Sequence, residues 1–267
     1  MTLKDQFNVA GTDTTLGYIG RAFAPAPADA DLVSILRAAG VVFLAKTNLP
    51  QSIMWCETEN NLWGLTTHPV DAGLTPGGST GGEGALIAEG GSLVGWGTDL
   101  GGSVRIPANL CGLYGLRPSV SGFFFLFVLE WTCGLTDGQA SRLPYEGVPV
   151  STEGQEHVPS AVGPLARSLG SIHLVVKHVI QSEPWRNDPR CVPIPWREQM
   201  YRVQQRPLVI GLMVDDGVVR VHPPVERIVR DAAAKLQAAG HKIVPWSPDG
   251  HAECIDVMVG RVKTFGD

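Results

Sequence analysis

Apolar residues recur every three or four positions in several stretches of the chain, the spacing that places them on one face of a helix. The clearest example is 223–239. Prolines can occupy its first turn, Val225, Ile228 and Leu236 share one face, and Gly240 follows as a stop. These patterns and their flanking turn residues predict helices over 29–39, 83–89, 169–180 and 223–239.

Short apolar runs without a helical period predict strands. Residues 41–45 are apolar throughout and do not alternate with polar residues, so we expect a strand that is buried on both faces. Further strands are expected at 93–96, 208–213 and 242–246, and residues 1–10 are expected to form a strand end and a turn. The last two strands flank the helix at 223–239, which predicts a βαβ unit with a right-handed crossover.

Two glycine-rich turns interrupt this pattern, and each of them contains a serine. The first spans 77–82 around Ser79, and the second spans 99–103 and ends at Ser103. Glycine permits a positive φ and lets a ligand approach the backbone closely. A serine nucleophile needs a base for its proton, and its attack on a carbonyl creates an oxyanion that backbone N–H groups can stabilise. The two turns therefore favour nucleophilic catalysis at a carbonyl group.

Composition narrows the class of protein further. The 267 residues are 44% hydrophobic and 18% charged, with 32 glycines and 20 prolines, which is typical of a loop-rich α/β enzyme with a substantial core. A net charge of −5 without a long basic run argues against a nucleic-acid partner. The five cysteines are widely spaced and form no CxxC pair, which indicates reduced thiols rather than disulfides or a zinc site. We interpret Cys111 as a core residue rather than a nucleophile.

The glycine-rich segment carries a family resemblance. GGSTGGEGALIA followed by GTDLGGSVRIPA, together with Lys4-Asp5-Gln6-Phe7 upstream, resembles the amidase signature family, in particular its fungal acetamidase and fatty acid amide hydrolase branch. The resemblance implies an α/β fold with a mixed, largely central β-sheet flanked by helices. It also implies that 1–267 is a single incomplete amidase domain, truncated at both ends. We expect a cytoplasmic protein because no signal peptide is evident.

The same resemblance implies a Ser–cis-Ser–Lys triad. Ser103 would be the nucleophile, Ser79, held after a cis peptide bond, would bridge, and Lys4 would be the base that accepts the proton through Ser79. Lys46 occupies a lysine position of the family that is not catalytic. Backbone N–H groups of Leu100, Gly101, Gly102 and Ser103 would form the oxyanion hole, and the main chain at Ile53 would face the substrate carbonyl.

Three further residues are assigned supporting roles. Thr80 stands where the family usually has a second serine, so we expect reduced rather than abolished activity from that change. Asp99 and Arg105 flank the second turn, and we interpret Arg105 as structural. The implied reaction is hydrolysis of a carboxylic acid amide, a small-molecule substrate, to the acid and ammonia. It needs neither a cofactor nor a metal.

Other interpretations use the same residues. Residues 77–81 also match the GxSxG nucleophile elbow of α/β-hydrolase esterases, which require a later acid and a later histidine. Six histidines lie downstream, although none is in a recognisable motif. A phosphate-binding loop is not supported, since the chain has no Gly-Lys pair and no GxGxxG. An inactive fragment or pseudoenzyme of the family is the remaining alternative.

Residues 120–140 match neither the periodic pattern nor the family resemblance. Phenylalanines at 123, 124, 125 and 127 make this an atypical apolar insertion, although the run is too short to span a bilayer. A membrane-touching loop is one interpretation. We prefer an intron translated in frame, because the family pattern resumes directly after the segment.

Overall fold

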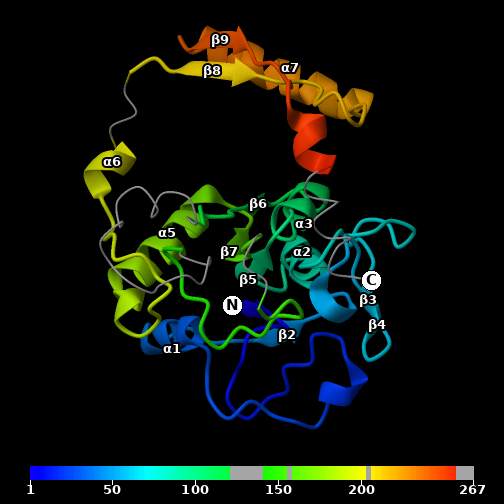
Figure 1. Cartoon of the computed structure of the whole chain (residues 1–267), viewed down its shortest axis with the longest axis vertical. Helices are drawn as coiled ribbons and strands as arrows, with labels where there is room; N and C mark the ends of the chain where they lie inside the picture. The colour runs from blue at the N-terminus through cyan, green and yellow to red at the C-terminus, as the bar shows by residue number, and fades with distance from the viewer. Residues whose placement is uncertain (121–140, 155–157, 203–205, 257–267) are drawn as a thin grey trace. The chain divides into compact units, whose positions relative to one another are not determined.

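The computed structural model describes residues 1–120, 141–154, 158–202 and 206–256 (Figure 1). The chain divides into two compact units, Met1–Trp196 and Arg197–Asp267, and each is described by itself. The predicted insertion at 120–140 lies outside the described residues, apart from Val120. In the described part of the chain, no helix is both long and apolar enough to cross a membrane.

The first unit is built on a five-stranded mixed sheet with the order β2-β1-β5-β7-β6. β1 (Thr2–Lys4) runs parallel to its two neighbours, β2 (Ala45–Thr47) and β5 (Val94–Asp99). β7 (Ala161–Ala166) pairs antiparallel with both β5 and β6 (Tyr114–Gly115). The predicted fold class, a mixed central sheet flanked by helices, is confirmed.

Helices cover both faces of this sheet (Figure 1). Apolar residues of α1 (Asp31–Ala38) and α5 (Leu169–Gln181) share a core cluster with Leu3 and Trp96 of the sheet. Residues of α2 (Gly81–Ala88) and α3 (Arg105–Leu110) form a second cluster with Leu165. The predicted helices 29–39, 83–89 and 169–180 are thus confirmed, with their ends shifted by one or two residues.

Short elements complete the first unit. They are the 3-10 turns η1 (Ile19–Arg21), η2 (Gln51–Ile53) and η3 (Pro184–Arg186), and an antiparallel hairpin of β3 (Glu59–Asn60) and β4 (Gly64–Leu65).

The predicted buried strand over 41–45 is wrong. The strand is β2, over Ala45–Thr47, and Val42 and Leu44 are 70% and 62% exposed. β1 is only three residues long, and its register pairs Thr2 with Ala45 and Lys4 with Thr47. An apolar run shows where a strand is favoured, but the partner strand decides which residues are paired.

The second unit contains α6 (Glu198–Arg202) and a βαβ unit. β8 (Val209–Leu212) and β9 (Lys242–Pro245) pair in parallel, and α7 (Pro223–Ala238) connects them. The predicted strand–helix–strand order over 208–246 is therefore confirmed. Two prolines begin α7, where their missing N–H groups cost no hydrogen bond.

Candidate active site

Lys4 ends β1 with its side chain fully buried. Its Nζ lies 2.6 Å from Ser79 Oγ and 3.2 Å from Thr98 Oγ1. Burial lowers the pKa of this amine to about 7, against the opposing effect of the Asp99 and Glu83 charges. At neutral pH a substantial fraction of Lys4 is therefore uncharged, and an uncharged amine can accept a proton.

The first glycine-rich turn holds Ser79 against that amine. The peptide bond between Gly78 and Ser79 is cis, as the family resemblance implies, and Ser79 is buried. Gly77 has φ +83°, and a Cβ on Gly78 would lie 2.4 Å from the carbonyl oxygen of Glu57. Glycine is required at both positions, because the backbone conformation at the first and the close approach at the second exclude a side chain.

Thr80 follows Ser79 and is completely buried at the start of α2. Its methyl group fits only because Gly97 of β5 has no side chain. A Cβ at Gly97 would lie 2.4 Å from Thr80 Cγ2. The threonine is accommodated in this chain by a glycine on the facing strand, and its own N–H donates to the carbonyl oxygen of Ser103 over 3.1 Å.

Asp99 organises the second glycine-rich turn. Its buried carboxylate accepts hydrogen bonds from the N–H groups of Gly102, Val104 and Arg105 and a bidentate pair of bonds from the Arg105 guanidinium, at 2.9 and 3.0 Å. Burial alone would raise the pKa of Asp99, but the hydrogen bonds from Arg105 and Val104 lower it below its usual value. Asp99 therefore remains ionised and fixes the turn that carries Ser103.

The hydrogen bonds of Asp99 leave only some of the candidate oxyanion donors available. The N–H of Gly102 donates to Asp99 over 2.7 Å and is therefore already engaged. The N–H groups of Leu100, Gly101 and Ser103 make no hydrogen bond to another described residue. These three are the groups in the turn that are left to face a ligand.

Ser103 is placed next to the first turn by the hydrogen bond from Thr80 N–H, and its own side chain is partly exposed. Within the described part of the chain, no hydrogen bond joins Ser103 Oγ to Ser79 Oγ. Lys4 and Ser79 are thus in direct contact, while Ser103 is held nearby through its backbone.

Ile53 lies in η2 with a positive φ of 62°, after Ser52 at 67°. This backbone conformation is uncommon for residues other than glycine. The N–H of Ile53 donates to the carbonyl oxygen of Pro50 over 2.9 Å, whereas its carbonyl accepts no hydrogen bond from another residue that the structure describes. Its expected position opposite a substrate remains a prediction.

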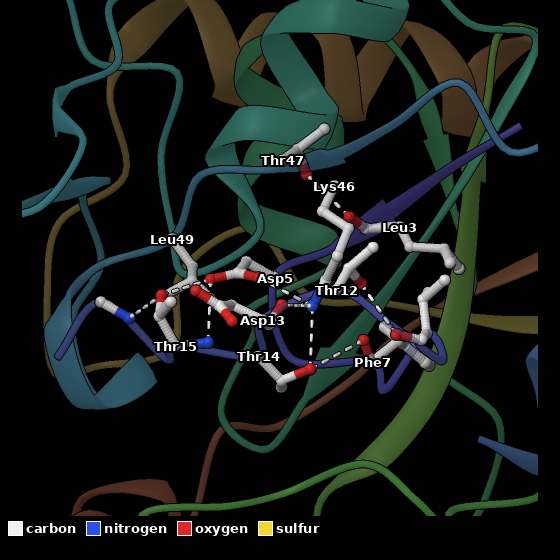
Figure 2. A network of polar contacts seen from close by, with 12 residues as sticks. Leu3, Asp5, Phe7, Thr12, Asp13, Thr14, Thr15, Lys46, Thr47 and Leu49 are labelled. Atoms are coloured by element: carbon white, nitrogen blue, oxygen red, sulfur yellow. Dashed lines mark hydrogen bonds and ion pairs between the residues drawn. The ribbon is translucent and has the colours of Figure 1, made fainter. Parts of the chain in front are cut away.

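Lys46 belongs to a separate polar network, shown in Figure 2. Its Nζ forms a 2.9 Å ion pair with Asp5, donates to Thr14 Oγ1 over 2.9 Å and donates to the carbonyl oxygen of Asp13. Asp5 also accepts a hydrogen bond from the hydroxyl of Thr15. Every donor of Lys46 has an acceptor, which indicates a structural role and separates it from Lys4.

Glu83 is a residue of the site that the sequence analysis missed. It lies in the first turn of α2 with its side chain fully buried, and burial raises its pKa to about 7 against the opposing effect of its hydrogen bonds with the hydroxyls of Thr2 and Thr47. The available signal was a single acidic residue among the small and apolar residues of GGEGALIA.

Neither a metal nor a thiol suggests competing chemistry among the described residues. No group of three or more His, Cys, Asp or Glu side chains there could hold a metal ion. Burial raises the pKa of the Cys111 thiol to about 11, so the nucleophilic thiolate is scarce at neutral pH.

Fold and site together define a class of α/β protein in which a buried lysine contacts a serine in a glycine-rich turn. The family model Amidase matches residues 1–265, so the chain belongs to the amidase family. The chain is 51% identical to Amidase 1 of Gibberella moniliformis, over 97% of this chain and 46% of that protein. It is 41% identical to Acetamidase of Aspergillus oryzae, over 96% of this chain and 44% of that protein.

A solved structure of fatty acid amide hydrolase has the same fold over 93% of this chain, with a TM-score of 0.79 and 35% identity. The match covers 40% of that chain. The chain thus spans less than half the length of the relatives it matches. This fold also removes the α/β-hydrolase alternative, since the basic partner of Ser79 is Lys4 rather than a histidine.

Proposed function

We propose that this chain carries the catalytic centre of an amidase, with Lys4 as base, Ser79 as bridge and Ser103 as nucleophile. The observation that supports this most is the 2.6 Å contact between Lys4 Nζ and Ser79 Oγ, in which the lysine has a pKa of about 7. A lysine that titrates near neutrality and touches a hydroxyl is suited to accept its proton.

The reaction proceeds through an acyl-enzyme. Lys4 takes the proton of Ser79, Ser79 takes that of Ser103, and Ser103 Oγ forms a bond to the amide carbonyl carbon. The oxyanion faces the N–H groups of Leu100, Gly101 and Ser103. The proton returns along the same route to the leaving nitrogen as the C–N bond breaks. Water then attacks the ester, which releases the acid.

Small aliphatic amides are the proposed substrates, since relatives of this chain are named acetamidases. Long-chain amides are the second class, in view of the match to fatty acid amide hydrolase. The competing proposal is an inactive fragment, because the chain covers 46% of Amidase 1. A site can hold every catalytic residue and still fail if these are misplaced by about 1 Å.

A fluorophosphonate probe distinguishes these proposals without a chosen substrate, because it labels an assembled serine nucleophile. The purified chain is compared with Ser103→Ala, Ser79→Ala and Lys4→Ala. The controls are Ser34→Ala and Lys235→Ala, which change exposed residues. We expect labelling to disappear in Ser103→Ala, to fall at least tenfold in the other two active-site variants, and to stay unchanged in the controls. No labelling of a folded wild-type chain would support the inactive fragment.

A further inference from the structure

Glu83 is a buried acid to which the proposed reaction gives no role. Its carboxyl group lies between α2 and the sheet, with Oε2 2.5 Å from Thr2 Oγ1 and Oε1 2.8 Å from Thr47 Oγ1. Gly95 of β5 makes room for it, since a Cβ there would lie 1.8 Å from Oε2. Thr2 and Lys4 alternate with Leu3 along β1, so the carboxyl group lies on the same face of the sheet as Lys4.

The hydrogen bonds around this carboxyl group allow its proton to be assigned. Four oxygens form a chain, Glu83 Oε2, Thr2 Oγ1, Ser92 Oγ and Val94 O, with contacts of 2.5, 3.0 and 3.0 Å. Three contacts need three protons. The two hydroxyls supply one each, and the carbonyl of Val94 has none. The single proton of Thr2 cannot serve both Ser92 and Glu83, so when all three contacts are hydrogen bonds the third proton is that of Glu83.

The surroundings of Lys4 lead to the same assignment. An ammonium group has three N–H donors, but only Ser79 Oγ and Thr98 Oγ1 lie within reach among the described residues. Thr98 donates its proton to Gln6 Oε1 over 2.6 Å, so it accepts from Lys4. An uncharged amine can donate to Thr98 and still present its lone pair to the Ser79 hydroxyl.

We propose that Lys4 and Glu83 share one proton and that this proton resides on Glu83, which leaves Lys4 as an uncharged base. Glu83 is then a positioning residue that acts through Lys4 without touching the substrate. An ionised Glu83 would raise the pKa of Lys4 and favour its ammonium form. The raised pKa of Glu83 agrees with the assignment, as expected for an acid in a buried site.

Among the described residues, the other charged groups that act on this pair are Met1 and Asp99. Directly before β1, the amino group of Met1 favours the ionised form of Glu83. On β5 Asp99 favours the ammonium form of Lys4, but it is already paired with Arg105 at the start of α3. Thr47, the contact from β2, is uncharged.

Infrared difference spectroscopy tests the protonation directly and does not depend on catalysis. Spectra of the purified chain and of Glu83→Gln are compared at pH 7, where the pair holds one proton, with Glu89→Gln, an exposed acid at the end of the same helix, as the control. We expect Glu83→Gln to lose the absorption of a protonated carboxylic acid and the control to lose that of a carboxylate. Loss of a carboxylate band in Glu83→Gln would overturn the assignment.

The role of Glu83 rests on the proposed function and is tested by fluorophosphonate labelling between pH 5 and pH 9. Glutamine is permanently neutral, and its amide can donate to Thr2 and accept from Thr47 as the acid does. We expect the labelling rate of Glu83→Gln at pH 8 to be within about threefold of the wild-type rate. The fall of this rate at low pH should occur at the same pH as in the wild type or at a lower one.

Two outcomes would contradict this role. One is a fall of more than tenfold in the labelling of folded Glu83→Gln, which would mean that a negative charge is needed. The other is a Glu83→Gln chain that does not fold, because the amide reproduces the hydrogen bonds of the neutral acid but not those of a carboxylate. If even the wild-type chain does not label, the proposed function fails, and the infrared result still decides the protonation of Glu83.

Discussion

The amine of Lys4 is buried against two hydroxyl groups instead of being hydrated, and this environment determines its protonation state. An exposed lysine keeps a pKa above 10 and remains an ammonium at neutral pH. The hydrogen bond to Ser79 at 2.6 Å does not restore that charge, because desolvation is the largest effect on the amine. The residue that is suited to accept a proton is therefore one that makes the folded state less stable.

A first prediction concerns the pH dependence of the site. The pKa of Lys4 is about 7, so its uncharged form is depleted below that pH. We expect the rate of fluorophosphonate labelling to fall about tenfold per pH unit well below pH 7 and to level off above pH 8. A rate that is constant down to pH 5 would contradict Lys4 as the base.

The second prediction links the same lysine to stability. Between pH 7 and about 10.5 the unfolded chain binds a proton at Lys4 that the folded chain does not, so this residue makes stability rise with pH across that window. Lys4→Met removes the effect. We expect it to lower labelling at least tenfold, to raise the melting temperature at pH 7 or leave it unchanged, and to flatten that rise. A large loss of melting temperature would instead indicate a structural role for Lys4.

At the scale of elements, each glycine-rich turn is fixed by a different device. The first is fixed by close packing, since a Cβ on Gly95 of β5 would strike Glu83 of α2, and a Cβ on Gly97 would strike Thr80, which directly precedes α2. The second is fixed by charge, through Asp99 and the backbone N–H groups that it accepts from. Helix α2 can therefore lie close to the sheet with its buried acid and its threonine in place.

The third prediction tests the packing of α2 on β5. Gly95→Ala places a methyl group where Glu83 Oε2 lies, so we expect a loss of roughly 3 kcal/mol in the free energy of unfolding and the loss of labelling. Gly20→Ala is the matched control, because a Cβ there meets nothing within 4 Å. Denaturant unfolding of both variants provides the measurement. Equal stability of the two would show that α2 is not held as closely as described.

The fourth prediction tests the charged turn. Asp99→Asn removes the ionised acceptor of three backbone N–H groups and of Arg105, and we expect it to cost about 2 kcal/mol and to reduce labelling at least tenfold. Arg105→Ala leaves the backbone bonds in place, and its side chain is half-exposed, so a smaller effect is expected. The reverse order of the two effects in unfolding and labelling experiments would contradict the role of Asp99.

At the scale of the whole molecule, the buried apolar residues are unevenly divided. Both core clusters lie within Met1–Trp196, whereas α7 contributes one buried residue, Ala233. Stability depends largely on buried apolar area, so we expect the first unit to be stabilised by its core more strongly than α7 is in the second. The candidate site lies entirely in the unit that has the larger core.

The fifth prediction follows from that division. We expect backbone amides of α7 to exchange with deuterium faster than those of β5, because local opening costs less where little apolar surface is buried. Hydrogen exchange followed by mass spectrometry measures both segments in one experiment. Equal protection of α7 and β5 would contradict the uneven division of stability.

The sequence by itself determined the elements that depend on local pattern and the residues that carry the family resemblance. The helices, the βαβ order and the two serine turns follow from spacing, glycine and proline, which act over a few residues. Tertiary structure alone decided the pairing of β2 with β1, the ion pair of Lys46 with Asp5, and the place of Glu83. Each of these depends on contacts between distant residues, such as the 75 positions between Lys4 and Ser79, and on burial, which no local pattern encodes.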